Sequence, residues 1–257
     1  MVNAKLVQEI KIYETDRYEI FKPMHGQPKH RAAKNASKLA QEIDPEIGNI
    51  IPIIVTPDYK VIDGNTRLEA VRMLKSKVRF QIVDSDDVQS LELMKMMNAA
   101  NQPWTINNFI EFYAEAYNLD EYKALRVFLE NNQISVGVIQ ELDNRINQND
   151  IKNGDLKKID YSILQDKVDK LYILHDAIGY EFMKSKLHLA RALNKILNYG
   201  QVNFTELIHK VKSKIKDEMK NRHMNRIDSS GSLLPILQKC YNYKRRDKKR
   251  IYDDLTE

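Results

Sequence analysis

The fold of the first part of the chain is decided by one stretch, which reads Val61-Ile62-Asp63-Gly64-Asn65-Thr66-Arg67-Leu68-Glu69-Ala70-Val71-Arg72-Met73-Leu74. Its first residues predict the end of a strand, and the apolar spacing after Gly64 predicts a helix from about Thr66 to Leu74. Gly64 has no Cβ, so the chain can turn sharply and a ligand can approach the peptide N–H groups. The first helical turn leaves N–H groups unpaired at the positive end of the helix dipole. The stretch therefore predicts a phosphate-binding turn.

Five residues of this turn are candidates for binding a phosphate or acting on it. Arg67 carries a planar, permanently charged guanidinium that fits phosphate oxygens, and Gly64, Asn65 and Thr66 form the turn itself. Asp63 is the candidate catalytic residue, because a carboxylate beside a phosphate can hold Mg²⁺ or act as a base. The alternative for Asp63 is a structural role at the start of the helix, where its oxygens accept backbone N–H bonds.

The composition sets broad limits on the class of protein. The 257 residues suffice for two domains of ordinary size. No apolar run reaches the ~20 residues that a membrane-spanning helix needs, and the N-terminus lacks a secretory segment, so we expect a cytoplasmic protein. The single cysteine, Cys240, excludes an internal disulfide and a cysteine-rich metal cage. The six histidines show no ligand spacing, so no structural metal is expected.

The net charge of +5 is concentrated near the end of the sequence. Residues 1–100 carry a net charge of +1, residues 101–205 carry −2, and residues 206–257 carry +6. A local excess of positive charge is typical of a surface that binds a polyanion, and nucleic acid is the first candidate in a protein without membrane segments. The alternative is a lysine-rich face that only confers solubility.

The pattern along the chain predicts an α+β fold. Strands are predicted near residues 6–13, 18–21, 50–55, 60–62 and 78–83, with helices over 35–43 and 66–74. Further helices are predicted over 88–98, 105–117, 121–130, 135–146, 161–178, 182–197, 204–223 and 233–241. Residues 228–232 are the one stretch loose enough for a linker. We therefore expect a small α/β domain (1–100), a helical domain (101–227) and a basic C-terminal segment (228–257).

Several motifs around the turn follow one another in an order known from a single superfamily. Gln27-Pro28-Lys29-His30-Arg31 resembles the Q-P-R element of ParB proteins, and residues 63–70 resemble their D-G-x-x-R-L-x-A pattern. Between them lie Leu39-Ala40-Gln41-Glu42-Ile43 and the strand Ile51-Pro52-Ile53-Ile54-Val55. Residues 98–122 resemble the N-x(4)-P-W-T segment that follows this domain in phage proteins. The chain thus resembles the ParB/sulfiredoxin superfamily, specifically the ParB-like proteins of phages and mobile elements.

This resemblance implies a nucleoside triphosphate, CTP or ATP, bound with Mg²⁺. Gly64 and Arg67 match the glycine and the last arginine of the G-E-R-R element of ParB and of the G-C-H-R element of sulfiredoxin. Asn65 replaces the sulfiredoxin cysteine and the ParB glutamate, and Thr66 replaces the first ParB arginine, so the sulfiredoxin reaction is not expected and ParB-type hydrolysis is not implied. The family's N-terminal phosphate-contacting loop corresponds to Lys29, His30 and Arg31.

Three stretches are candidates for binding DNA. Residues 121–146 could form a helix-turn-helix, although the turn glycine is missing and Glu141 and Asp143 are acidic. In the helix predicted over 204–223, the apolar residues form a stripe along one face, so the lysines on the other face can contact solvent or phosphate. The tail alternates tyrosines with cations and could bind nucleic acid or be a disordered basic tail. The predicted DNA contacts are Lys212, Lys216, Lys220, Lys244, Arg245, Arg246, Lys248, Lys249 and Arg250.

Two main hypotheses follow for the function. The first is a ParB-like, nucleotide-dependent DNA-binding protein that could form a homodimer. The second is an enzyme, either a nucleoside triphosphatase or phosphotransferase with Asp63 as base or metal ligand, or, ranked lower, a nuclease. Asp58 and Glu69 are doubtful companions for Asp63, which is why the nuclease ranks lower. A third reading is an interaction protein whose nucleotide pocket has lost its function.

The aromatic residues after position 100 are expected to be structural. Trp104 is the single tryptophan and stands at a predicted helix start. Tyr113, Tyr117 and Tyr122 follow at near-helical spacing. Large rings in such positions usually pack in a core, so we expect packing here rather than stacking on bases.

Overall fold

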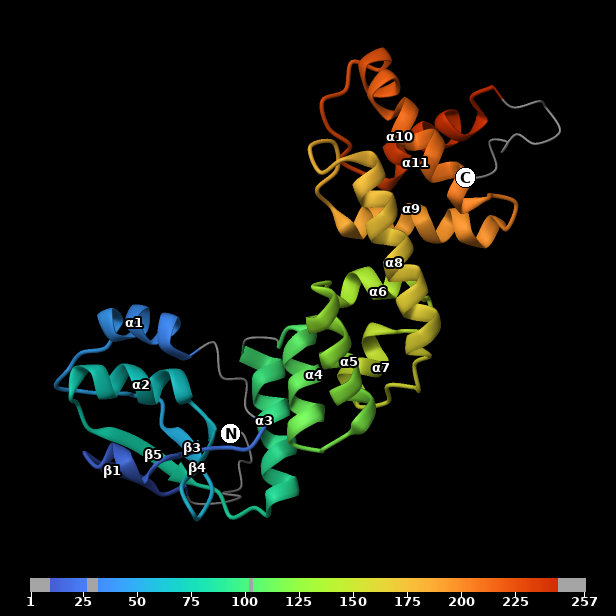
Figure 1. The fold of residues 1–257 in the computed structure, drawn as a ribbon. Coiled ribbons are helices and arrows are strands. Elements are labelled where there is room, and N and C mark those ends of the chain that lie inside the picture. The colour runs from blue at the N-terminus through green and yellow to red at the C-terminus, as the bar shows by residue number, and fades with distance from the viewer. Residues whose placement is uncertain (1–9, 27–31, 102–103, 245–257) are drawn as a thin grey trace, which may run out of the picture. The chain divides into compact units, whose positions relative to one another are not determined.

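The computed structural model describes residues 10–26, 32–101 and 104–244 (Figure 1). The chain divides into two compact units, Met1–Lys123 and Ala124–Glu257. A five-stranded sheet is combined with many helices, which confirms the predicted α+β fold class. Within the described ranges, no helix combines the length and apolar character needed to cross a membrane.

The first unit is built on a mixed sheet with strand order β1-β5-β3-β4-β2. The strands are β1 Ile12–Thr15, β2 Lys22–Pro23, β3 Ile53–Val55, β4 Lys60–Asp63 and β5 Val78–Ile82. β3 pairs antiparallel with β4 and parallel with β5, while β1 is antiparallel to β5 and β2 is parallel to β4. β3 and β4 form a hairpin, and Tyr59 in its turn takes a φ of +65°.

The helices of this unit are α1 Ala32–Glu42, α2 Asn65–Leu74, α3 Asp87–Asn101 and α4 Ile106–Glu115. α1 packs along α2, α2 on β3, and α3 on β4; Figure 1 shows α1 and α2 on the same side of the sheet. The core consists of Phe21, Ile53, Val55, Val61, Leu68, Val71, Val78 and Phe80. This core fixes the end of β4 and the start of α2.

The structure corrects two strand predictions in this unit. The strand predicted over 6–13 is displaced, because β1 spans Ile12–Thr15; residues 1–9 lie outside the described ranges. Residues 18–21 were predicted as extended, but Tyr18–Ile20 form a 3₁₀ turn. The Tyr18 hydroxyl donates a hydrogen bond to the carbonyl oxygen of Ser76 at 2.5 Å. This long-range contact fixes the turn, and local sequence does not reveal it.

The predicted packing of the aromatic residues after position 100 is confirmed. Trp104 is 7% exposed, and its ring meets Phe109 and Phe112 edge to face, with centroid distances of 5.3 and 5.0 Å. Tyr113 packs against Tyr117 and Tyr122 at centroid distances of 5.5 and 4.9 Å. Such edge-to-face and tilted arrangements add to the stability that burial provides.

The second unit is helical. Its elements are the greater part of α5 Asp120–Asn132, then α6 Val136–Leu142, α7 Gln148–Asn153, α8 Tyr161–Ile178, α9 Lys186–Tyr199, α10 Phe204–Asn221 and α11 Ser230–Asn242. α6 packs on α8 and α9, α10 on α8 and α11, and α11 on α9. The short α7 was not predicted from the sequence. The helix predicted over 135–146 ends at Leu142, and the one predicted from 182 begins at Lys186.

The predicted linker over 228–232 is instead the start of α11. Ser229 and Ser232 form a capping box, in which the Ser229 hydroxyl accepts from the Ser232 N–H at 3.1 Å. Cys240 and Tyr241 near the end of α11 are each 1% exposed. The N-cap is the reason why a serine- and glycine-rich stretch is helical here. α11 therefore contributes to the core of the helical unit.

Candidate phosphate-binding site

Gly64 joins β4 to α2 in a conformation that favours glycine. Its φ is +103° and its ψ is 17°, in the left-handed region. A Cβ atom at this position would lie 2.6 Å from Ile53 Cγ2 and 3.0 Å from Arg67 Nη2. Because Ile53 is fully buried, it cannot easily move aside. Both the backbone angle and the available space therefore require glycine.

The start of α2 has the geometry of an anion site. The N–H of Leu68 donates to the Gly64 carbonyl oxygen at 2.8 Å, which closes the first helical hydrogen bond. The N–H groups of Asn65, Thr66 and Arg67 precede this bond and have no acceptor within the helix. Gly64 occupies the N-cap position and has no side chain to satisfy them. The strand-glycine-helix geometry predicted from the sequence is thus confirmed, whereas its use for phosphate stays a prediction.

Arg67 and Asp63 form an ion pair across this turn. Arg67 Nη2 donates to Asp63 Oδ2 at 2.8 Å and lies 3.4 Å from the Pro52 carbonyl oxygen. Each of the two charged side chains is only 23% exposed. Arg67 Nε is buried and has no hydrogen-bond acceptor in the described part of the chain. The guanidinium is therefore held beside the turn with one donor left unsatisfied.

The contact made by Asp63 differs from each role considered for it in the sequence. The residue ends β4 and accepts from Arg67, whereas Gly64 takes the N-cap position. The two other carboxylates considered beside Asp63 form ion pairs of their own. Asp58 Oδ2 lies 3.2 Å from Lys60 Nζ, and Glu69 Oε1 lies 2.7 Å from Arg72 Nη1. No group of three or more histidine, cysteine or acidic side chains in the described ranges could hold a metal ion. A catalytic role for Asp63 stays a prediction.

The other predicted phosphate contacts lie outside the described residues. They are Lys29, His30 and Arg31, which directly precede α1. α1 itself packs along α2, the helix that begins at the turn.

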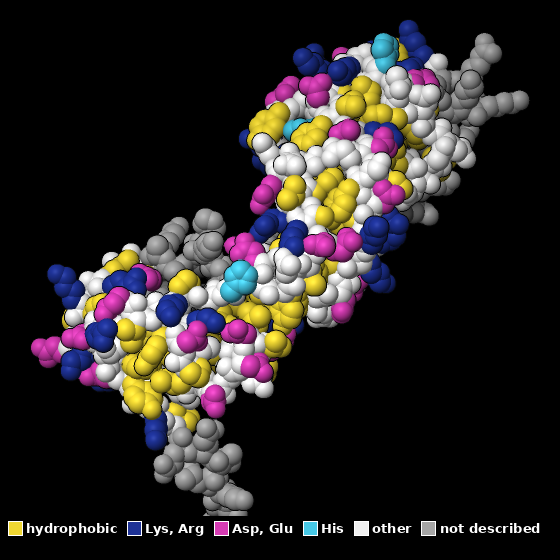
Figure 2. All heavy atoms as spheres, turned by 60° about the horizontal axis from the view of Figure 1, so that its bottom comes forward, with side chains coloured by type: hydrophobic (Ala, Val, Ile, Leu, Met, Phe, Trp, Pro, Cys, Tyr) yellow, Lys and Arg dark blue, Asp and Glu magenta, His cyan; other side chains and the backbone are white. Residues whose placement is uncertain are grey.

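The predicted cationic face of α10 is present in the second unit. Leu207, Val211, Ile215 and Met219 are buried as predicted, and Lys212, Lys216 and Lys220 are exposed. Lys212 Nζ lies 3.2 Å from Asp176 Oδ2 of α8. On the face shown in Figure 2, lysines and arginines alternate with acidic side chains and form no continuous basic patch over the described residues.

A second group of cations, around Tyr243, was only partly predicted. Lys214 Nζ lies 4.3 Å from the centroid of the Tyr243 ring, Lys244 Nζ at 5.5 Å and Lys210 Nζ at 5.9 Å. Lys210 also donates to the Tyr243 carbonyl oxygen at 2.6 Å. Of these three lysines, only Lys244 is among the predicted DNA contacts. The group itself was not predicted, because it forms only when α11 packs on α10. The remaining predicted contacts, Arg245, Arg246, Lys248, Lys249 and Arg250, lie outside the described residues.

Two helices joined by a short turn, α5 and α6, lie where a helix-turn-helix was considered, but the second helix is poorly suited to reading DNA. Gln133 takes a φ of +49° in the turn, where a glycine is usual. Most of α6 is buried, including Val138 and Ile139, and it packs on α9. Its Glu141 forms an ion pair with Arg191 of α9. α6 carries no cation and is largely covered, whereas a recognition helix presents an open polar face to the major groove.

Fold and site together define a class: an α/β unit with a strand-glycine-helix turn of the kind that binds anions, followed by a helical unit with exposed lysines. No protein-family model matches the sequence, and no curated protein is significantly similar to it. Among solved structures, the chain is similar to that of a Pnob8-like ParB-N domain, with 15% identity and a TM-score of 0.37 over 89% of this chain and 98% of that chain. A likeness at this level assigns neither a family nor a function.

Proposed function

We propose that the protein is a ParB-like nucleotide-binding protein that also binds DNA, with CTP or ATP and Mg²⁺ as the ligand of the Gly64 turn. The observation that carries the nucleotide site is the left-handed Gly64 at the N-terminus of α2, with Arg67 held beside it. The order of the sequence motifs from Gln27 to Ala70 supports the same assignment. The basic residues of α10 and of the C-terminal tail are the proposed DNA contacts, and a homodimer is the proposed assembly.

A phosphate group at the turn would satisfy donors that the protein leaves open. The N–H groups of Asn65, Thr66 and Arg67 have no acceptor within α2, and the Arg67 Nε has none in the described part of the chain. Hydrogen bonds to an ionised acceptor are about twice as strong as neutral ones. Phosphate binding at the N-terminus of α2 would thus pair N–H donors that the helix itself leaves without an acceptor.

Catalysis is not part of the proposal. The Asp63 carboxylate accepts a hydrogen bond from Arg67, and both Asp58 and Glu69 are paired with cations. A phosphoryl-transfer or nuclease site needs a free base or several converging carboxylates. The contacts around the turn favour binding over turnover.

Thermal unfolding with nucleotides tests the proposed site. At a ligand concentration of 100 Kd, binding stabilises the folded state by about 2.7 kcal/mol, so CTP or ATP with Mg²⁺ should raise the Tm of the full chain. The variant Arg67→Gln should lose about tenfold or more in affinity, because it removes a charge-assisted hydrogen bond. Arg72→Gln is the matched control, since Arg72 lies on the same helix and pairs with Glu69 in solvent.

Two results would contradict the proposal. The first is a Tm that no nucleoside triphosphate changes. The second is an equal effect of both arginine variants on nucleotide affinity, which would mean that general positive charge, and not the turn, attracts the nucleotide.

A further inference from the structure

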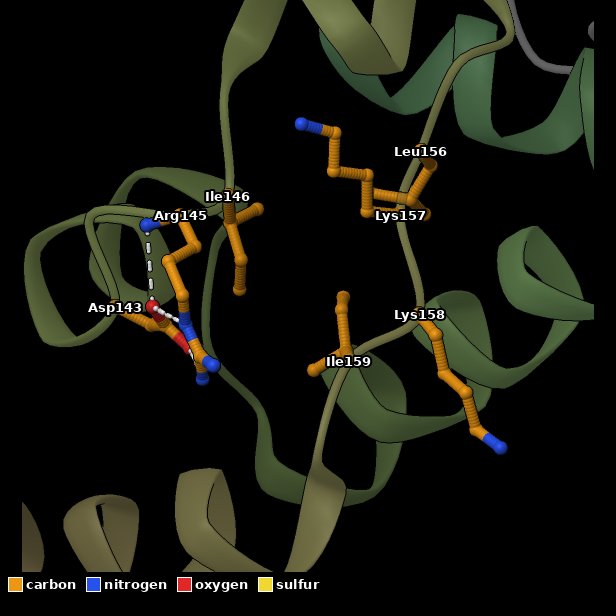
Figure 3. A pocket seen from close by; sticks show the side chains of 7 residues that line it. All are labelled: Asp143, Arg145, Ile146, Leu156, Lys157, Lys158 and Ile159. Carbon is orange, nitrogen blue, oxygen red and sulfur yellow. Dashed lines mark hydrogen bonds and ion pairs between the residues drawn. The ribbon is translucent and has the colours of Figure 1, made fainter.

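The helical unit contains a pocket that none of the predicted sites uses. Its volume is about 390 Å³, within the ~300–1,000 Å³ that is usual for small-molecule sites. Two loops line it, one after α6 and one between α7 and α8 (Figure 3). The lining residues are Asp143, Arg145, Ile146, Leu156, Lys157, Lys158 and Ile159.

The centre of this pocket is apolar. Ile146 and Ile159 come from the two different loops and point toward one another across the space (Figure 3). They are 5% and 7% exposed, so the surrounding structure holds both in place. An apolar group placed between them would be removed from water on two sides, which favours binding in proportion to the area buried.

One wall of the pocket carries an ion pair that is already satisfied. Arg145 donates from Nε to Asp143 Oδ1 at 2.9 Å and from Nη2 to Oδ2 at 2.7 Å. This bidentate contact lowers the pKa of Asp143, so that the carboxylate stays ionised and paired. Asp143 is therefore not a free counter-charge for a cationic ligand.

The opposite wall provides an unpaired positive charge. Lys157 extends its amine across the opening, whereas Lys158 points away from the pocket (Figure 3). Neither ammonium group has an acidic partner among the residues that the structure describes. The pocket thus combines an apolar centre with one available cation at its edge.

We propose that this pocket binds a small organic anion with an apolar body. The body lies between Ile146 and Ile159, and the anionic head meets the ammonium group of Lys157. A neutral ligand of the same shape would lose the contact with Lys157, and Lys157 and Lys158 would repel a cationic one. The site is independent of the Gly64 turn, which belongs to the other compact unit.

A series of probes with the same apolar chain tests this proposal. Octanoate, octanol and octylammonium, each below its micelle concentration, are titrated into the full chain, and the methyl resonances of Ile146 and Ile159 are followed by NMR. We expect octanoate to shift both resonances and to bind about threefold more tightly than octanol at low salt, the size of effect of an exposed ion pair. Octylammonium should bind most weakly.

Two lysine variants distinguish a direct contact between the ligand and Lys157 from nonspecific attraction by the positive charge of the region. Lys157→Met should remove the preference for octanoate over octanol, whereas Lys158→Met, which removes the same charge from the next residue, should keep it. Ile159→Ala should weaken the binding of both octanoate and octanol. Thermal unfolding of each variant shows whether it folds as the parent chain does, and Lys157→Gln replaces Lys157→Met if it does not.

Three outcomes would overturn the proposal. The first is equal affinity of the parent chain for the three probes, and the second is an equal effect of the two lysine variants on the affinity for octanoate. The third is a spectrum in which other resonances shift on titration while those of the Ile146 and Ile159 methyl groups do not. The first outcome depends on the parent chain alone, so the proposal can fail even if every variant is unstable.

Discussion

At the scale of single residues, the central feature is that Asp63 already forms an ion pair with Arg67, the arginine proposed to bind phosphate. The two side chains are 2.8 Å apart and mostly buried, so the carboxylate both holds the guanidinium in place and competes with an incoming anion. A spacing of four residues predicts an ion pair only where both residues lie on one helix. Asp63 instead ends β4, so the pair depends on the left-handed turn at Gly64 and was not predicted from the sequence.

Replacing Asp63 should therefore strengthen nucleotide binding. Asp63→Asn removes a negative charge beside the phosphate position while its amide oxygen can still accept from Arg67, and we expect an affinity about fivefold higher at low salt. Asp58→Asn is the control, because Asp58 is an acidic residue of the same unit that pairs with Lys60. Affinity is measured by equilibrium titration with CTP and ATP. Weaker binding by Asp63→Asn would mean that Asp63 helps to hold the nucleotide or its Mg²⁺.

At the scale of helices and strands, prediction succeeded where local sequence decides the structure. The β4-Gly64-α2 turn and the apolar stripe of α10 depend on residues close together in the chain, and both are confirmed. The 3₁₀ turn at Tyr18 depends on Ser76, and the cations around Tyr243 depend on the packing of α11 on α10. The pocket beside α6 likewise needs two loops to meet. Contacts between distant residues therefore account for what the sequence did not predict.

The start of α11 provides a prediction at this scale. Ser229→Ala removes the N-cap hydrogen bond to Ser232, which should lower the free energy of unfolding of the helical unit by about 1 kcal/mol. Ser213→Ala is the control, because the exposed Ser213 hydroxyl donates only to the Lys210 carbonyl oxygen of the same helix, and alanine is the better helix former. Urea unfolding followed by circular dichroism measures both variants. Equal stability of Ser229→Ala and the parent chain would show that the cap contributes nothing.

At the scale of the whole molecule, the placement of α11 changes how DNA binding must be tested. A chain ending near Asp228 would lose buried residues such as Leu233 and Cys240, so any loss of binding could reflect unfolding. A chain ending at Lys244 keeps α11 and removes only residues 245–257. This shorter deletion separates the contribution of the basic tail from that of the folded unit.

Within the folded unit, the salt dependence of DNA binding should identify the cations that contact phosphate. Lys216 and Lys220 are exposed and have no acidic partner among the residues described, so Lys216→Gln with Lys220→Gln should reduce the slope of log K against log salt by about 1.8, or ~0.9 per contact. Lys210→Gln with Lys214→Gln removes the same charge, but Lys210 is bound to the Tyr243 carbonyl oxygen and Lys214 lies 3.2 Å from Asp217. We expect a smaller change for this second pair, measured by titrating labelled duplex DNA at several salt concentrations. Equal changes for both pairs would mean that α10 attracts DNA through its overall charge and makes no defined contacts, and an unchanged slope in both would place DNA binding outside α10.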